Sequence, residues 1–170
     1  MGFRILDVLA ARHALPDWKR RGTRLETSGG VAGQAALLVK PLTFMNRSGQ
    51  ALVELRRVEP FGPDELLLCY DDFALPLGRI RIRPSGSHGG HNGMESVIER
   101  LGSSSFARLR VGIAPKSGGI DDNTDFVLSP FRRNERAVID EAVERAVDAA
   151  ECVVSEGLLA AMNCYNPEPS

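Results

Sequence analysis

The sequence predicts an α/β fold in a single domain over residues 1–170. Three observations support this prediction. Short apolar runs with strand spacing alternate along the chain with segments of helical spacing. A chain of 170 residues is long enough to bury one hydrophobic core. Finally, no internal repeat, low-complexity tract or long linker divides the sequence.

The first half of the chain opens with a predicted helix. Apolar residues within 5–9 recur at helical spacing, and a proline ends the predicted helix in the region 13–16. Residues 18–33 are polar and contain glycines, so we expect mainly loop with some strand. Residues 35–39 form a short apolar run that ends at a lysine and a proline, which predicts a strand entering a turn. The continuous apolar run 66–70 is typical of a strand buried on both faces.

The second half contains two predicted strands that each carry arginines on one face. Residues 78–83 alternate isoleucine with arginine, and residues 108–113 alternate arginine with aliphatic residues. Between them, the glycine-rich loop 84–93 precedes a helix predicted over 94–101, which ends at a capping glycine. Apolar residues spaced along 138–150 predict a long amphipathic helix near the end of the chain.

Charge is distributed unevenly although the net charge is only −1. Residues 79–110 hold six arginines against two glutamates, a local balance of +4, whereas residues 135–156 hold seven acids against two arginines, a balance of −5. One region could therefore face phosphate while the other faces away from it.

Composition excludes several classes of protein. No run of about 18 apolar residues is present, and the first residues lack the layout of a signal peptide. We therefore expect a cytoplasmic protein without a membrane partner. Three widely spaced cysteines, Cys69, Cys152 and Cys164, indicate neither a disulfide framework nor a zinc site. The histidines lack HExxH spacing, and the glycine loop lacks the closing residues of a phosphate-binding loop, so neither a metal nor a nucleotide is expected.

Three polar clusters could carry chemistry: Thr43 to Asn46 after a strand, Asp71 at a strand end, and His88 to Gly93 before a helix. Each has an ordinary structural explanation when taken alone. An asparagine after a strand commonly forms a turn, a strand-end aspartate commonly caps one, and a glycine loop commonly just reverses the chain. However, the carboxyl end of a buried strand is also where open α/β sheets place their sites.

Taken together and in order, these segments resemble the motifs of bacterial peptidyl-tRNA hydrolases. The resemblance rests on residues 40–49 (KPLTFMNRSG), 70–78 (YDDFALPLG), 86–93 (GSHGGHNG) and 106–113 (FARLRVGI), and on FVLSPF at 126–131 before an acidic helix. It implies a fold in which a mixed, twisted sheet is flanked by helices, and an enzyme that cleaves the ester joining a peptide to the 3′ ribose of tRNA. It also implies a monomer without metal or organic cofactor, whose partner is peptidyl-tRNA and for which no protein partner is indicated.

The resemblance assigns roles to individual residues. Asp71 would orient a catalytic histidine and keep it in a proton-accepting tautomer. Phe44 and Asn46 would contact the tRNA end and the peptide, Asn92 would hold the substrate through its amide, and His91 lies beside it as a further substrate contact. A histidine suits ester hydrolysis because its pKa lies near neutrality, so the side chain can accept a proton from water at physiological pH.

Three arginines match the positions of a basic clamp on tRNA phosphate: Arg81, Arg83 and Arg110. The two predicted arginine-faced strands agree with this role. For the arginines of the first strand, Arg79, Arg81 and Arg83, a solvated strand face with no ligand is the alternative explanation.

The sequence departs from the family at its beginning. Family members start with a glycine-rich strand resembling VGLGNPG, followed by a tyrosine and by TRHN, and the catalytic histidine of that string would lie just upstream of Met1. We expect a gene start assigned too late, because loss of an interior strand would leave unpaired backbone groups at a cost of several kcal/mol. The alternative is a truly short, catalytically inactive RNA-binding relative.

Overall fold

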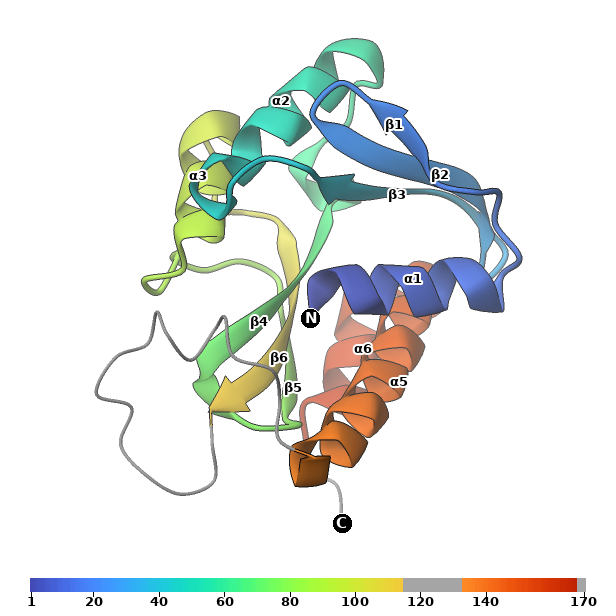
Figure 1. The fold of residues 1–170 in the computed structure, drawn as a ribbon, viewed down its shortest axis with the longest axis vertical. Coiled ribbons are helices and arrows are strands. Elements are labelled where there is room, and N and C mark those ends of the chain that lie inside the picture. The colour runs from blue at the N-terminus through green and yellow to red at the C-terminus, as the bar shows by residue number, and fades with distance from the viewer. Residues whose placement is uncertain (115–132, 168–170) are drawn as a thin grey trace.

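The structure, a computed structural model, describes residues 1–114 and 133–167 (Figure 1). The segment 126–131, which contributed to the resemblance, lies outside this range. No helix in the described ranges is long and apolar enough to cross a membrane. The elements follow in the order α1 (Gly2–Arg12), β1 (Lys19–Arg21), β2 (Arg24–Val31), β3 (Gln34–Pro41), η1 (Met45–Arg47), α2 (Ser48–Val58), η2 (Pro63–Glu65), β4 (Leu67–Pro76), β5 (Ile80–Arg83), α3 (Asn92–Leu101), β6 (Ala107–Ala114), α5 (Arg133–Glu156) and α6 (Leu158–Tyr165).

The α/β class and the mixed sheet flanked by helices are confirmed, but the described strands form two sheets rather than one. β1, β2 and β3 make an antiparallel sheet, and β4, β6 and β5 make a mixed sheet in that order. The prediction that residues 18–33 are mainly loop was wrong, because β1 and β2 lie there. β2 pairs with β3 over its whole length through a two-residue turn at Ala32 and Gly33, both with positive φ, so local hairpin closure outweighs the polar composition.

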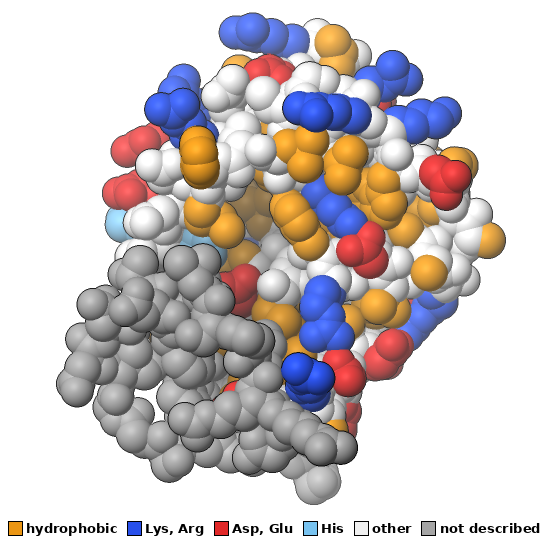
Figure 2. Space-filling view, in the orientation of Figure 1, with side chains coloured by type: hydrophobic (Ala, Val, Ile, Leu, Met, Phe, Trp, Pro, Cys, Tyr) orange, Lys and Arg blue, Asp and Glu red, His pale blue; other side chains and the backbone are white. Residues whose placement is uncertain are grey.

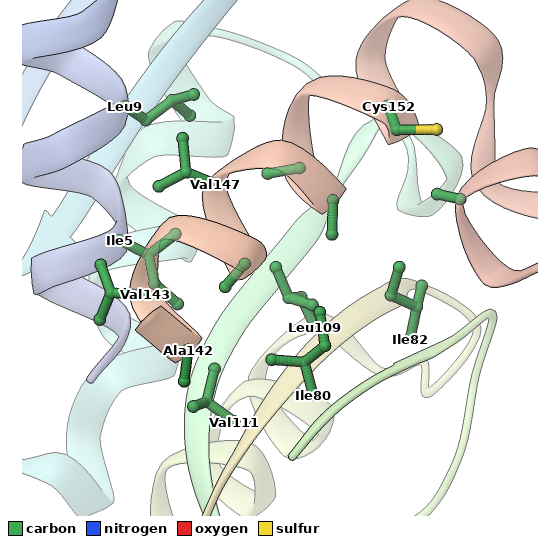
Figure 3. Packing of buried hydrophobic residues seen from close by; sticks show 14 of the residues in the cluster. Ile5, Leu9, Ile80, Ile82, Leu109, Val111, Ala142, Val143, Val147 and Cys152 are labelled. Carbon is green, nitrogen blue, oxygen red and sulfur yellow. The ribbon is translucent and has the colours of Figure 1, made fainter. Parts of the chain in front are cut away.

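One face of the mixed sheet packs against α1, α5 and α6 and holds the larger hydrophobic core. Ile80 and Ile82 of β5 and Leu109 and Val111 of β6 point into it, as the alternating pattern predicted. Figure 3 shows these side chains meeting Ile5 and Leu9 from α1 and the apolar stripe of α5. The positions of α1 and α5 and the burial of their apolar stripes confirm the two amphipathic helices.

The opposite face of the mixed sheet packs against α2 and α3, with a smaller core built on Leu52, Met94, Val97 and Phe106. The two helices cross in close contact at Gly49. A Cβ there would lie 2.2 Å from the carbonyl oxygen of Ser96, and the Gly49 amide donates to the Ser96 hydroxyl at 3.2 Å. Only glycine fits this crossing, which fixes the start of α2 against α3.

Strand β4 differs from its prediction in burial and in length. Its residues from Leu67 to Phe73 are half-buried rather than buried on both faces. The physical reason is that β4 is an edge strand, paired on one side with β6. The strand also continues past Asp71 to Pro76, with an irregularity between Asp72 and Pro76, so Asp71 lies within the strand and not after its end.

The free edge of β5 is covered by one side chain from the end of α6. The Asn166 amide oxygen accepts from the Ile82 N–H at 2.7 Å, and its nitrogen donates to the Ile82 carbonyl at 3.1 Å. The Asn166 carbonyl also accepts from the Arg79 guanidinium at 2.8 Å. A side-chain amide thus imitates a neighbouring strand and satisfies edge groups that would otherwise be open to association.

We therefore expect Asn166→Asp to lower the free energy of unfolding by about 1–3 kcal/mol, because a carboxylate cannot donate to the Ile82 carbonyl and two oxygens would face each other. Urea unfolding measures the change. Asn163→Asp is the matched control, since it places the same charge on the exposed side of the same helix near the same end. An equal loss in both variants would show that helix electrostatics, and not the edge pairing, is responsible.

Candidate active site

The structure brings the segment Thr43 to Asn46 against the start of α3. η1 packs on the first turn of α3, where a Cβ at Gly93 would lie 2.6 Å from Sδ of Met45. Asn46 lies in η1, Asn92 is the first residue of α3, and both side chains are exposed on this surface. Two polar clusters that are 46 positions apart in the sequence therefore form one neighbourhood, as the resemblance implies.

His91 caps the helix that carries Asn92. Its Nδ1 accepts from the backbone N–H groups of Gly93 at 3.1 Å and Met94 at 3.2 Å. This geometry requires an unprotonated Nδ1, so the ring proton of neutral His91 is on Nε2. The observed role of His91 is to fix the helix start, and Nε2 is the ring nitrogen left for a substrate.

Tyr70 connects this helix start to strand β4. Its ring meets that of His91 edge-on, with ring centroids 4.9 Å apart and planes inclined at 68°. Burial raises the pKa of the Tyr70 hydroxyl, and the positive charges of Arg108 and Arg110 oppose that rise in part. The phenol is therefore neutral at physiological pH and can act as a hydrogen-bond donor.

Asp71 lies next to Tyr70 and points to the other face of β4, because successive side chains of a strand alternate. The amino group of Met1, at the start of α1, donates to Asp71 Oδ1 at 3.2 Å. α1 approaches β4 so closely that a Cβ at Gly2 would lie 2.1 Å from the Cys69 carbonyl oxygen. Burial in this contact raises the pKa of the Cys69 thiol to about 12, so the thiol is not a nucleophile at neutral pH.

The arginines of β5 and β6 lie on the same sheet face as Tyr70. Arg81 is the register partner of Arg110, and Arg83 of Arg108. The charge of Arg110 is partly neutralised, because its Nε donates to Asp72 Oδ2 at 2.6 Å in a largely buried ion pair. Arg81 is half-buried and Arg83 is exposed.

Besides Arg110, two more arginines on these strands are engaged within the protein. Arg108, on the arginine face predicted for residues 108–113, is only 2% exposed and donates to backbone carbonyl groups, so it adds no charge to the surface. The reason is that β6 runs beneath α3, where a side chain on the polar face is covered. Arg79 donates to the Asn166 carbonyl and helps to close the β5 edge.

Exposed apolar side chains border the two loops. Phe44 is 80% exposed and Met45 57%, and Leu42 precedes them on the same segment. Figure 2 shows hydrophobic side chains gathered over β3, beside a hollow between that strand and the α2–α3 corner. Thr43 Oγ1 is buried without a hydrogen-bond partner among the described groups. The surface offers a carboxylate, neutral amides, an aromatic ring and guanidinium groups, which suit a large polar ligand with an apolar part.

The described residues do not form a cluster of metal-binding side chains. Nowhere in residues 1–114 and 133–167 do three histidine, cysteine or acidic side chains gather as metal ligands would. The groups near Asp71 and Asn92 are those of acid–base and hydrogen-bonding chemistry.

Two features of the site escaped the sequence analysis. The pairing of Asp72 with Arg110 depends on strand register across 38 positions of sequence, which no local pattern reveals. The capping role of His91 was also missed, although its position immediately before a helical segment was a usable signal.

Comparison with known proteins points to one family. The sequence model of a family described as peptidyl-tRNA hydrolase matches residues 1–170. The chain is 48% identical to the peptidyl-tRNA hydrolase of Chloroflexus aggregans, over 98% of this chain and 89% of the relative. It is 41% identical to that of Symbiobacterium thermophilum, over 97% and 88% respectively. A crystal structure of peptidyl-tRNA hydrolase from Acinetobacter baumannii superposes with a TM-score of 0.89 at 29% identity, covering 97% of this chain and 84% of that one.

Proposed function

Because this chain belongs to the peptidyl-tRNA hydrolase family, we propose that it hydrolyses the ester joining a peptide to the 3′ ribose of tRNA and so recycles tRNA from abortive translation. The observation that carries the proposal is the packing of η1, with Asn46, on the first turn of α3, with Asn92, beside the strand of Asp71. The reaction would take place in the cytoplasm, on a monomer that needs no metal or organic cofactor.

Asp71 is the proposed orienting carboxylate for a histidine base. The resemblance implies that this histidine lies on a segment ahead of the position equivalent to Met1. The amino group of Met1 lies 3.2 Å from the Asp71 carboxylate, so a segment leading into α1 would pass directly beside it. A carboxylate at hydrogen-bond distance holds an imidazole in one tautomer and stabilises the imidazolium that forms when the ring takes a proton from water.

Neutral groups hold the substrate in this proposal. The amides of Asn46 and Asn92 align the ester carbonyl and the attacking water without adding charge. The start of α3 also favours the developing oxyanion, because helix N-termini carry partial positive charge. The exposed ring of Phe44 offers a stacking surface for the unpaired end of tRNA or for the peptide, and His91 can add its Nε2–H.

The arginine face supplies contacts to the tRNA backbone. One face of the sheet carries Arg81, Arg83 and Arg110. Asp72 neutralises part of this positive charge and holds the Arg110 guanidinium through a hydrogen bond from its Nε. Phosphate contacts set affinity and orientation without reading sequence, which suits an enzyme that acts on many different tRNAs.

The activity is tested with N-acetylated aminoacyl-tRNA, by following release of the acetylated amino acid. Two forms are compared: residues 1–170, and an extended form that includes the residues encoded in frame upstream of the Met1 codon. We expect the extended form to release the product at a rate that depends on enzyme concentration. Binding of tRNA without release in either form would support the inactive RNA-binding alternative.

Arg83→Ala tests the arginine face. We expect tRNA to bind about 3- to 10-fold more weakly, and the slope of log affinity against log salt concentration to fall by about 1, because one phosphate contact is lost. Filter binding over a range of salt concentrations measures both. Arg57→Ala, on the exposed end of α2, is the matched control and should change neither quantity. Equal behaviour of the two variants would contradict a phosphate role for Arg83.

A further inference from the structure

Arg108 is a buried cation that the proposed chemistry does not use. It lies on β6 beneath α3, with 2% of its surface exposed, and no carboxylate among the described residues pairs with it. Its Nε is buried without a hydrogen-bond partner. Burying a charge in this way is costly, so the contacts that Arg108 does make show what it contributes.

The Arg108 guanidinium joins the two loops on either side of α3. One terminal nitrogen donates to the Ser87 carbonyl at 2.9 Å, in the glycine loop before the helix. The other donates to the Ser104 carbonyl at 3.0 Å, in the turn after the helix. Because both flanks are bound to one planar group on a rigid strand, the position of α3 along its own axis is set relative to the sheet.

A third contact ties the same group to the core under α3. The guanidinium carbon lies 4.9 Å from the centre of the Phe106 ring, which is 1% exposed and packs with Met94 and Val97 of α3. The cation is thus held from below by an aromatic face and on its two sides by backbone carbonyl groups.

Apart from the bond from Arg108, the hydrogen bonds shown for residues 86–90 stay within the glycine loop. Gly86, Gly89 and Gly90 all have positive φ, and fixing such residues costs more backbone entropy than fixing any others. Within the loop, the His91 N–H donates to the His88 carbonyl at 3.0 Å, a bond that does not reach the sheet. The hydrogen bond from Arg108 to the Ser87 carbonyl does connect the loop to the sheet. Ser87 lies four residues before His91 in the sequence.

We propose that Arg108 is a positioning residue for the reaction: it fixes the glycine loop and the start of α3, and thereby the amide of Asn92, but does not bind tRNA phosphate. The proposal rests on the proposed function, because it assumes that Asn92 holds the ester. It gives Arg108 a different role from its register partner Arg83, which is exposed and proposed to bind phosphate.

The variants are Arg108→Lys, which keeps the charge but cannot reach both carbonyl groups, and Arg108→Met, which keeps much of the side-chain volume but has no donor. In the extended form, we expect Arg108→Lys to lower kcat about 10-fold while KM, tRNA affinity and its salt slope stay unchanged. The rate is divided by the fraction of molecules that bind tRNA, so that loss of folded protein does not count as loss of turnover. A raised KM and a reduced salt slope at unchanged kcat would overturn the proposal, since they would make Arg108 a phosphate ligand.

A double-mutant cycle separates positioning from general destabilisation. If Arg108 acts through Asn92, Arg108→Lys should lower kcat far less in an Asn92→Ala background than in the parent. Full additivity of the two effects would contradict the proposal.

Hydrogen exchange tests the inference independently of turnover. In Arg108→Lys and Arg108→Met, amide exchange should rise in residues 86–92, and it should remain unchanged there in Arg83→Lys. If no form hydrolyses peptidyl-tRNA, the proposed function fails while this measurement still decides whether Arg108 holds the loop. Unchanged exchange in both Arg108 variants would overturn the inference even in an active enzyme.

Discussion

Asp71→Asn in the extended form is expected to lower kcat for peptidyl-tRNA roughly 10²- to 10⁴-fold, the range over which general acid–base groups contribute. KM should change little, because the side chain is proposed to orient the base and not to bind the substrate. An amide retains the shape of the carboxylate but lacks its negative charge, so it can neither fix the same tautomer nor stabilise an imidazolium. Steady-state kinetics on N-acetylated aminoacyl-tRNA measures both constants.

Asp72→Asn provides the contrast at the neighbouring carboxylate. It weakens the ion pair with Arg110 but does not touch the proposed base, so it should alter tRNA affinity and salt dependence more than kcat. Asp17→Asn, at an exposed position between α1 and β1, should alter neither. If Asp72→Asn lowered kcat as much as Asp71→Asn does, the assignment of the orienting role to Asp71 would be wrong.

Gly49→Ala is expected to lower the free energy of unfolding by about 2–3 kcal/mol, at the upper end of the cost of overpacking. The new Cβ would lie 2.2 Å from the Ser96 carbonyl oxygen, which belongs to helix backbone and cannot move aside on its own. Helix propensity alone predicts the opposite sign, since alanine usually stabilises a helix relative to glycine by up to about 1 kcal/mol. Urea unfolding of the purified protein therefore distinguishes the two effects by sign.

Gly30→Ala is the control for that measurement. Gly30 is exposed on β2, has no positive φ, and a Cβ there would meet no atom within 4 Å. We expect a change within about 0.5 kcal/mol, as for other surface substitutions. Equal losses at both positions would contradict the close crossing of α2 and α3 that brings η1 to the start of α3.

The order and type of most elements followed from sequence because hydrophobic spacing records which face of each element is buried. The strand around Ile80 and Ile82 and the helix closed by Gly102, which has φ of +68°, show this directly. The hairpin of β1 and β2 did not follow, because its stability comes from pairing with β3 and not from its own composition.

The candidate site was only partly predictable, for a related reason. The nearness of Asn46 to Asn92 depends on the crossing at Gly49, and a glycine that is needed for close approach looks the same in sequence as one that permits a turn. Likewise, the alternating pattern of a strand does not show whether an arginine on it is exposed or buried under a helix. Arg83 is exposed, whereas Arg108 is buried. Its state depends on what packs above the strand.

Hydrolysis that works through Asp71 is tested by the release of acetylated amino acid from N-acetylated aminoacyl-tRNA by the extended form, alongside its Asp71→Asn variant at equal tRNA occupancy. We expect rapid release by the parent and a loss of at least about 10²-fold in the variant, with tRNA binding retained in both. Equal release by the two proteins, or binding without release by the parent, would contradict a hydrolase that works through Asp71.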